Sequence, residues 1–227
     1  MISSTFDRLR ARGEKALVAF VTAGDPSLAE LPGVLGALIK GGADLIEVGI
    51  PFSDPIADGP VIQASSQRAL DRGVTPRSVL EMLAQGKSTR GDVPVVLMGY
   101  YNPILKWGLD EFANAAKAAG VSGVIVCDLI PEEAGDWLNA CSTHGLDSIF
   151  LAAPTSTDQR LDAVCKASTG FVYAVSRTGV TGSESSLAPD VRVLVERIKV
   201  RATVPVCVGF GISQPEHVAT VCAVADG

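Results

Sequence analysis

Residues Ile46–Pro60 read IEVGIPFSDPIADGP, in which a strand signal runs into a loop rich in carboxylates. The segment Ala43–Gly49 predicts a buried strand, and Glu47 lies inside it between two apolar neighbours. A carboxylate on a buried strand is costly unless it is paired or used in chemistry. Asp54 and Asp58 follow on the loop. The stretch therefore predicts a carboxylate pair, one on the strand and one on the loop, able to divide acid and base roles.

The same alternation of a short apolar run and a longer segment recurs along the whole chain. The short runs, several of them rich in Val and Ile, predict strands buried on both faces: Ala16–Thr22, Ala43–Gly49, Val93–Met98, Gly123–Cys127, Ser148–Ala152, Phe171–Val175 and Val204–Val208. The longer segments have helical spacing, and several open with capping signals. They are Ser27–Lys40, Val61–Asp71, Pro76–Gln85, Leu109–Ala119, Glu132–Thr143, Asp158–Ala167, Pro189–Val200 and Gln214–Val224.

A helix over Thr5–Arg12 followed by repeated strand–helix units allows two architectures, a (β/α)₈ TIM barrel or an open doubly wound sheet. No GxGxxG follows the first strand, and polar residues or glycines end many strands: Thr22, Glu47, Tyr100, Asp128, Ser176 and Gly209–Gly211. A ring of functional loops after the strands is typical of the barrel. We therefore predict a single (β/α) barrel domain over residues 1–227.

Composition narrows the class of protein. The net charge of −6, without a run of Lys and Arg, argues against a nucleic-acid surface. The 5 cysteines include no CxxC pair and predict reduced thiols in a cytoplasmic protein. The N-terminus is charged where a signal peptide is apolar, and no apolar run approaches the ~20 residues of a membrane span. His144 and His217 are expected at the surface, and no metal site is predicted.

Each candidate carboxylate also has a structural interpretation. Glu47 could be a core glutamate paired with a distant Arg or Lys. Asp58 lies just before the predicted helix Val61–Asp71 and could cap it or shape a turn. The same alternative holds for Asp54, which precedes a proline.

Two glycine-containing loops follow the late strands, over Ser176–Gly182 and Gly209–Ser213. Glycines at these ends of barrel strands let backbone amides approach a phosphate, and an adjoining helix N-terminus favours the anion. The alternative is that both are tight turns. Adjacent loops in this part of a barrel favour a phosphate site.

The stretch Ile46–Gly59 resembles the signature of the tryptophan synthase alpha chain family. The resemblance covers essentially the whole chain and extends to Phe20–Pro26, Met98–Pro103, Ser176–Gly182 and Gly209–Ser213. It implies cleavage of indole-3-glycerol phosphate to indole and glyceraldehyde 3-phosphate, with no cofactor in this chain. It also implies a heterotetramer of two alpha and two beta chains, in which the beta chain holds pyridoxal phosphate and consumes the indole.

The resemblance also implies roles for individual residues. Glu47 matches the acid–base carboxylate, and Asp58 matches the carboxylate that hydrogen-bonds the indole N–H. Thr181 matches the residue that fixes Asp58 when its loop closes. The other expected site residues are the apolar walls Phe20, Tyr100, Tyr173 and Phe210, the phosphate-loop glycines Gly182 and Gly211, and the beta-chain-facing residues Pro51 and Asp54.

The last residues of the sequence bear on the closure of the barrel. Ala225–Gly227 falls where the family's eighth strand begins, so the barrel is expected to lack its eighth strand, the Gly-Ser phosphate loop after it and the last helix.

Two rival functions are also considered. One rival is another phosphate-binding barrel of tryptophan or histidine biosynthesis, which the spacing from Glu47 to Asp58 disfavours. The other rival is a non-catalytic or impaired alpha-like chain that mainly activates a beta chain.

Overall fold

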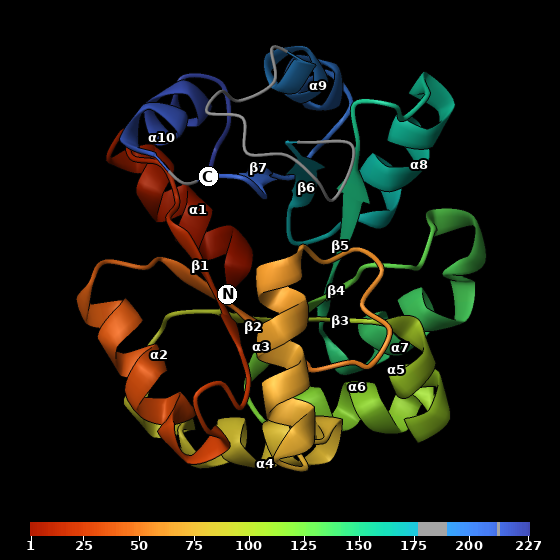
Figure 1. The fold of residues 1–227 in the computed structure, drawn as a ribbon. Coiled ribbons are helices and arrows are strands. Elements are labelled where there is room, and N and C mark those ends of the chain that lie inside the picture. Colours follow the sequence, from red (N-terminus) through yellow and green to blue (C-terminus); the bar gives the residue numbers. More distant parts are fainter. Residues whose placement is uncertain (177–189, 213) are drawn as a thin grey trace.

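A computed structural model describes residues 1–176, 190–212 and 214–227. Its parallel strands are hydrogen-bonded in sequential order, β1-β2-β3-β4-β5-β6-β7 (Figure 1). A doubly wound sheet reverses its strand order at a switch point, so the sequential order identifies a barrel. All seven predicted strands are confirmed, as β1 (Val18–Thr22), β2 (Leu45–Gly49), β3 (Val95–Gly99), β4 (Val121–Val126), β5 (Asp147–Ala152), β6 (Val172–Val175) and β7 (Val206–Gly209).

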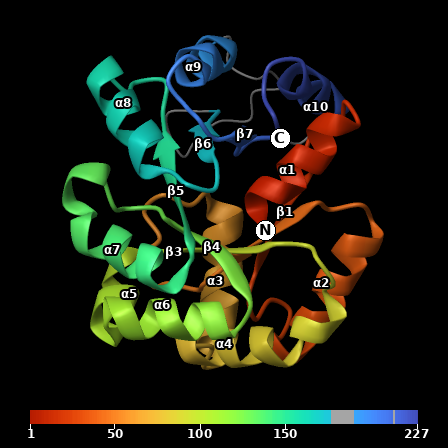
Figure 2. The same ribbon diagram turned by 180° about the vertical axis from the view of Figure 1, so that it is seen from behind.

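Most helices lie around the outside of the strands (Figures 1 and 2). They are α1 (Ile2–Ala11), α2 (Leu31–Lys40), α3 (Pro60–Asp71), α4 (Pro76–Gln85), α5 (Tyr101–Trp107), α6 (Leu109–Ala118), α7 (Gly135–His144), α8 (Asp158–Ala167), α9 (Asp190–Lys199) and α10 (Pro215–Cys222). Short 3₁₀ turns precede α2 and α7 and follow α4. Thr75 and Thr157 cap α4 and α8 through their side chains, as their sequence positions predict.

Alternate residues of the strands enter two different cores. Outward-facing residues such as Ile46 and Leu97 pack with the surrounding helices. Inward-facing residues such as Leu45 and Ile125 form a second cluster, which includes Ile2, Phe6 and Leu9 of α1. Both faces of each strand are therefore apolar, which explains the unbroken apolar runs in the sequence.

The last residues lie between β7 and the segment before β1. The Asp226 N–H donates to the Val206 carbonyl oxygen at 2.8 Å, and the Val208 N–H donates to the Gly227 carbonyl at 3.0 Å. On the other side, the Ala16 N–H donates to the Asp226 carbonyl at 2.9 Å. Residues 226–227 thus occupy the position expected for the start of an eighth strand.

Two further expectations are tested by the fold. His217 is buried, so its predicted surface position is wrong; it lies on the inward side of α10. His144 instead lies at the end of α7, with its Nε2 atom 2.8 Å from Asp110 Oδ1. No helix among the described residues combines the length and apolar character needed to cross a membrane.

Candidate active site

Glu47 is a buried carboxyl group at the centre of β2. It pairs in register with Phe20 of β1 on one side and with Val96 of β3 on the other. Only 4% of the residue is exposed, and no hydrogen bond or ion pair reaches its carboxyl group from the described part of the chain. Burial without a compensating cation raises its pKa to about 8. The interpretation as a core glutamate paired with Arg or Lys therefore has no support among the described residues.

Asp58 is held by a tyrosine rather than by a helix. The residue is 7% exposed, and the Tyr100 hydroxyl donates to Asp58 Oδ2 at 3.1 Å. The N-cap of α3 is Gly59, which makes no side-chain capping bond. Burial raises the pKa of Asp58, and the hydrogen bond from Tyr100 opposes that rise. The capping role considered from the sequence is therefore not observed.

The helix that follows Asp58 is fixed to the end of β1. Thr22 Oγ1 and Ser65 Oγ lie 2.7 Å apart in the interior. Nearer the surface, Arg68 of α3 donates to both carboxylate oxygens of Asp25, at 3.0 and 2.6 Å. These two contacts hold the middle and the C-terminal half of α3 at the carboxyl end of β1.

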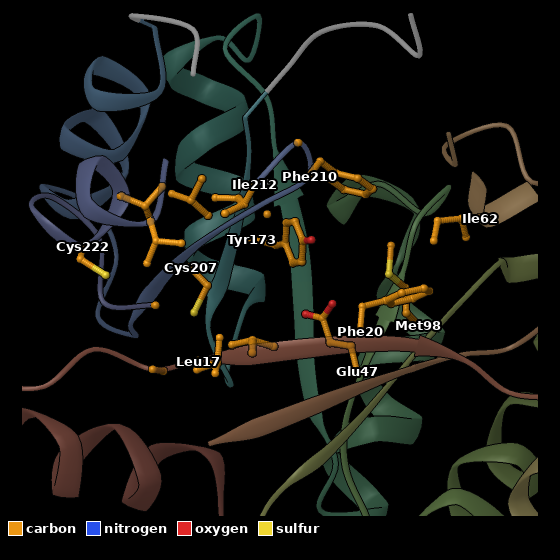
Figure 3. A pocket seen from close by; sticks show the side chains of 18 of the residues that line it. Leu17, Phe20, Glu47, Ile62, Met98, Tyr173, Cys207, Phe210, Ile212 and Cys222 are labelled. Carbon is orange, nitrogen blue, oxygen red and sulfur yellow. The ribbon is translucent and has the colours of Figure 1, made fainter. Parts of the chain in front are cut away.

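A cavity of about 430 Å³ brings the two carboxyl groups together. Its walls include three of the predicted apolar residues, Phe20, Tyr173 and Phe210. Figure 3 shows the Glu47 carboxyl group pointing into the space that Phe20, Met98 and Tyr173 border, with Phe210 and Ile62 farther along the cavity. The volume and the apolar lining suit a small aromatic ligand. The cavity also extends between β1 and β7.

Tyr100 lies next to the main cavity. Tyr100 adjoins a smaller hollow, which shares Phe20, Asp58 and Met98 with the main cavity, and is not among the residues that line the main cavity. Met98, two residues earlier on the same face of β3, lines the main cavity instead. Sequence reasoning missed Met98, although the alternation of side chains along β3 was a signal for it.

The loop after β7 has an unusual backbone conformation. Phe210 has φ 68° and Gly211 φ 67°, and a positive φ is uncommon for a residue other than glycine. Ser176 supports this turn through two bonds, from its N–H to the Gly209 carbonyl at 3.1 Å and from its hydroxyl to the Phe210 carbonyl. Gly211 thereby borders the cavity, as a phosphate-loop glycine must. Thr181 and Gly182 lie outside the described residues.

The loop before Asp58 is partly buried and partly open. Pro51 is buried, whereas Asp54 is exposed and accepts a hydrogen bond from the neighbouring Ser53 hydroxyl. Ile56 is 78% exposed, and Leu105 at the end of α5 and Ile130 after β4 are exposed too.

Potential ligands for a metal are dispersed. Within residues 1–176, 190–212 and 214–227, no group of three or more His, Cys, Asp or Glu side chains could hold a metal ion. All five cysteines are free thiols, and burial raises the pKa of Cys127, with smaller contributions from the charges of Asp58, Asp128 and Glu47.

The fold and the cavity define a (β/α)-barrel protein with two buried carboxyl groups at one end of its strands. The sequence profile of the tryptophan synthase alpha chain family matches residues 6–227. This chain belongs to that family. It is 52% identical over 226 residues to the tryptophan synthase alpha chain of Geobacter sulfurreducens, covering 100% of this chain and 85% of the relative. It is 51% identical over 218 residues to that of Solibacter usitatus, covering 96% and 81%.

Solved structures confirm the barrel. Tryptophan synthase from Mycobacterium tuberculosis superposes with a TM-score of 0.91 at 42% identity, over 100% of this chain and 86% of that one. The tryptophan synthase alpha subunit from Legionella pneumophila gives a TM-score of 0.90 at 40% identity, over 100% and 84%. The expected TIM-barrel class is therefore correct.

Proposed function

We propose that this chain is the lyase of tryptophan biosynthesis that cleaves indole-3-glycerol phosphate to indole and glyceraldehyde 3-phosphate. The observation that carries the proposal is Glu47, a buried carboxyl group with a pKa near 8 that faces an apolar cavity beside a second carboxyl group. Such a group is protonated at neutral pH and can donate a proton, which an ordinary glutamate cannot do efficiently.

The reaction is a retro-aldol cleavage. Glu47 donates its proton to indole C3, which becomes tetrahedral while the ring nitrogen carries the positive charge. The resulting carboxylate then removes the proton from the side-chain hydroxyl. As the carbon–carbon bond breaks, its electron pair restores the indole ring, the hydroxyl carbon becomes an aldehyde, and Glu47 regains a proton.

Asp58 has the complementary role. Its carboxylate accepts a hydrogen bond from the indole N–H and stabilises the positive charge that develops on the ring. The interaction strengthens as the charge grows, so it favours the transition state over bound substrate. Tyr173, Phe20 and Phe210 hold the indole ring, and the turn at Gly211 supports the phosphate. We assign Thr181 and Gly182 to the same site on the resemblance alone.

A partner beta chain is part of the proposal. Pro51 and Asp54 lie on the same loop as Asp58, and the side chains of Asp54 and Ile56 on this loop are exposed. A beta chain bound there would act on the loop that carries Asp58. We propose that this partner holds pyridoxal phosphate, consumes the indole and forms the heterotetramer of two alpha and two beta chains.

The test is a spectroscopic measurement of indole release from indole-3-glycerol phosphate. We expect turnover by this chain, increased when a beta chain is added. The rival role as a non-catalytic activator predicts no indole from the chain alone or from the complex, but faster beta-chain turnover of supplied indole. That result would overturn the proposal.

A further inference from the structure

Tyr100 makes three contacts with the loop that carries Asp58, and none of them requires a ligand. Its ring stacks on Phe52 with centroids 5.0 Å apart and planes at 28°. Its hydroxyl oxygen accepts the Ala57 N–H at 3.0 Å, and its hydroxyl proton is donated to Asp58 Oδ2 at 3.1 Å. Tyr100 is 4% exposed, so these contacts form in an interior where hydrogen bonds are strong.

The Tyr100 hydroxyl group accepts one hydrogen bond, from Ala57, and donates the other, to Asp58. A hydroxyl group has one proton, and the N–H of Ala57 occupies the acceptor side of the Tyr100 oxygen. The proton is therefore directed to Asp58 Oδ2. The ring contact holds the start of the loop and the hydroxyl holds its end, while Ile56 between them stays in solvent.

We propose that Tyr100 is a positioning residue, which clamps the loop from Phe52 to Asp58 and orients the Asp58 carboxylate for the developing positive charge. This inference rests on the proposed function for the role of Asp58. It adds a second role to the sequence-based assignment of Tyr100 as an apolar wall, because its hydroxyl contacts the loop and its ring contacts Phe52.

The titratable groups around Asp58 allow its ionisation to be followed in a pH–rate profile. Tyr100 after β3, Cys127 after β4 and Tyr173 on β6 all have pKa values raised by burial, so they stay neutral at acid and neutral pH. Glu47 on β2 titrates near pH 8. The substrate is the same for wild type and variant, so a difference between their acid limbs reports Asp58, whose charged form the hydrogen bond from Tyr100 favours.

The test compares Tyr100→Phe, which keeps the ring and removes both hydrogen bonds, with Phe52→Leu, which removes the ring contact and keeps both bonds. We expect Tyr100→Phe to lower kcat on the order of 10-fold, with little change in the Kd of inorganic phosphate. Its acid limb should move to higher pH, whereas Phe52→Leu should keep the acid limb of the wild type. An activity loss of equal size at every pH in Tyr100→Phe would show a merely structural role and overturn the inference.

A second measurement does not depend on catalysis. Amide hydrogen exchange of Ala57 should quicken at least about 10-fold in Tyr100→Phe, because its bonding partner is gone, and much less in Phe52→Leu. Unchanged exchange at Ala57 would overturn the clamp even if the enzyme is active. If the wild type releases no indole but Ala57 exchange responds as expected, the proposed function fails while the clamp stands.

Discussion

Tyr173 covers Gly209 so closely that a Cβ atom on Gly209 would lie 1.8 Å from the Tyr173 hydroxyl oxygen. The two residues are on neighbouring strands, β6 and β7, and both border the cavity. Residue 209 must therefore be glycine for the Tyr173 side chain to lie across β7.

Gly209→Ala should displace the Tyr173 ring and weaken binding of indole. We expect the Kd of indole to rise at least ~5-fold and the free energy of unfolding to fall by about 1–3 kcal/mol, the usual cost of overpacking. Calorimetry and denaturant unfolding measure the two effects. Gly33→Ala in α2 is the matched control, because a Cβ there meets nothing within 4 Å. Unchanged indole binding in Gly209→Ala would contradict the role of this contact.

Burial of Glu47 makes the stability of the protein depend on pH. The folded-state pKa is about 8 and the ordinary value is 4.5, so the folded protein keeps a proton that the unfolded chain releases between these values. The Glu47 contribution to stability therefore falls as pH rises above about 4.5, and the loss is complete above about 8. Its size is at most about 5 kcal/mol.

Glu47→Gln should remove this pH dependence. Denaturant unfolding of both proteins at pH 5 and pH 9 measures the difference, and the variant should gain stability relative to the wild type at the higher pH. An equal difference at both pH values would show that Glu47 is not held protonated.

The rate of indole formation should have two pH limits. Glu47 must begin protonated to donate to C3, so kcat/KM should fall as pH rises through about 8. Asp58 must be ionised, and its pKa is raised, so kcat/KM should also fall on the acid side at a pH above the ordinary range of an aspartate. Steady-state kinetics across pH 4–10 checks both limits. A kcat/KM that continues to rise above pH 8 would contradict the acid role of Glu47.

Asp58→Asn and Gly211→Asp should separate transition-state from ground-state interactions. Asp58→Asn should lower kcat and weaken substrate binding only slightly, because its interaction grows with the positive charge on indole. A carboxylate at position 211 would repel the phosphate in bound substrate and transition state alike. Calorimetry gives the substrate dissociation constant of each variant. Weaker binding by Asp58→Asn than by Gly211→Asp would reverse the assignment.

The sequence predicted the strands well because each strand is apolar on both faces, a signal that local residues carry. It did not predict α5, a short helix in Tyr101–Trp107 with Pro103 in its first turn, where proline is tolerated. The partner of Asp58 was also out of reach. The residues before α3 suit a cap, and only the packing of β3 against β2 brings the Tyr100 hydroxyl to it from 42 residues away. The same limit applies to His217, whose burial depends on how α10 packs.

Single-turnover indole formation by folded Glu47→Gln is the most direct test of the central claim. The substitution keeps the shape of the side chain and removes its exchangeable acid proton. Circular dichroism and the Kd of indole establish that the fold and the cavity are intact. We predict a loss of ~10²–10⁴-fold in the rate, the usual contribution of one acid–base group. A rate within about threefold of the wild type, in a folded variant that binds indole normally, would contradict the claim that Glu47 is the acid–base group of this protein.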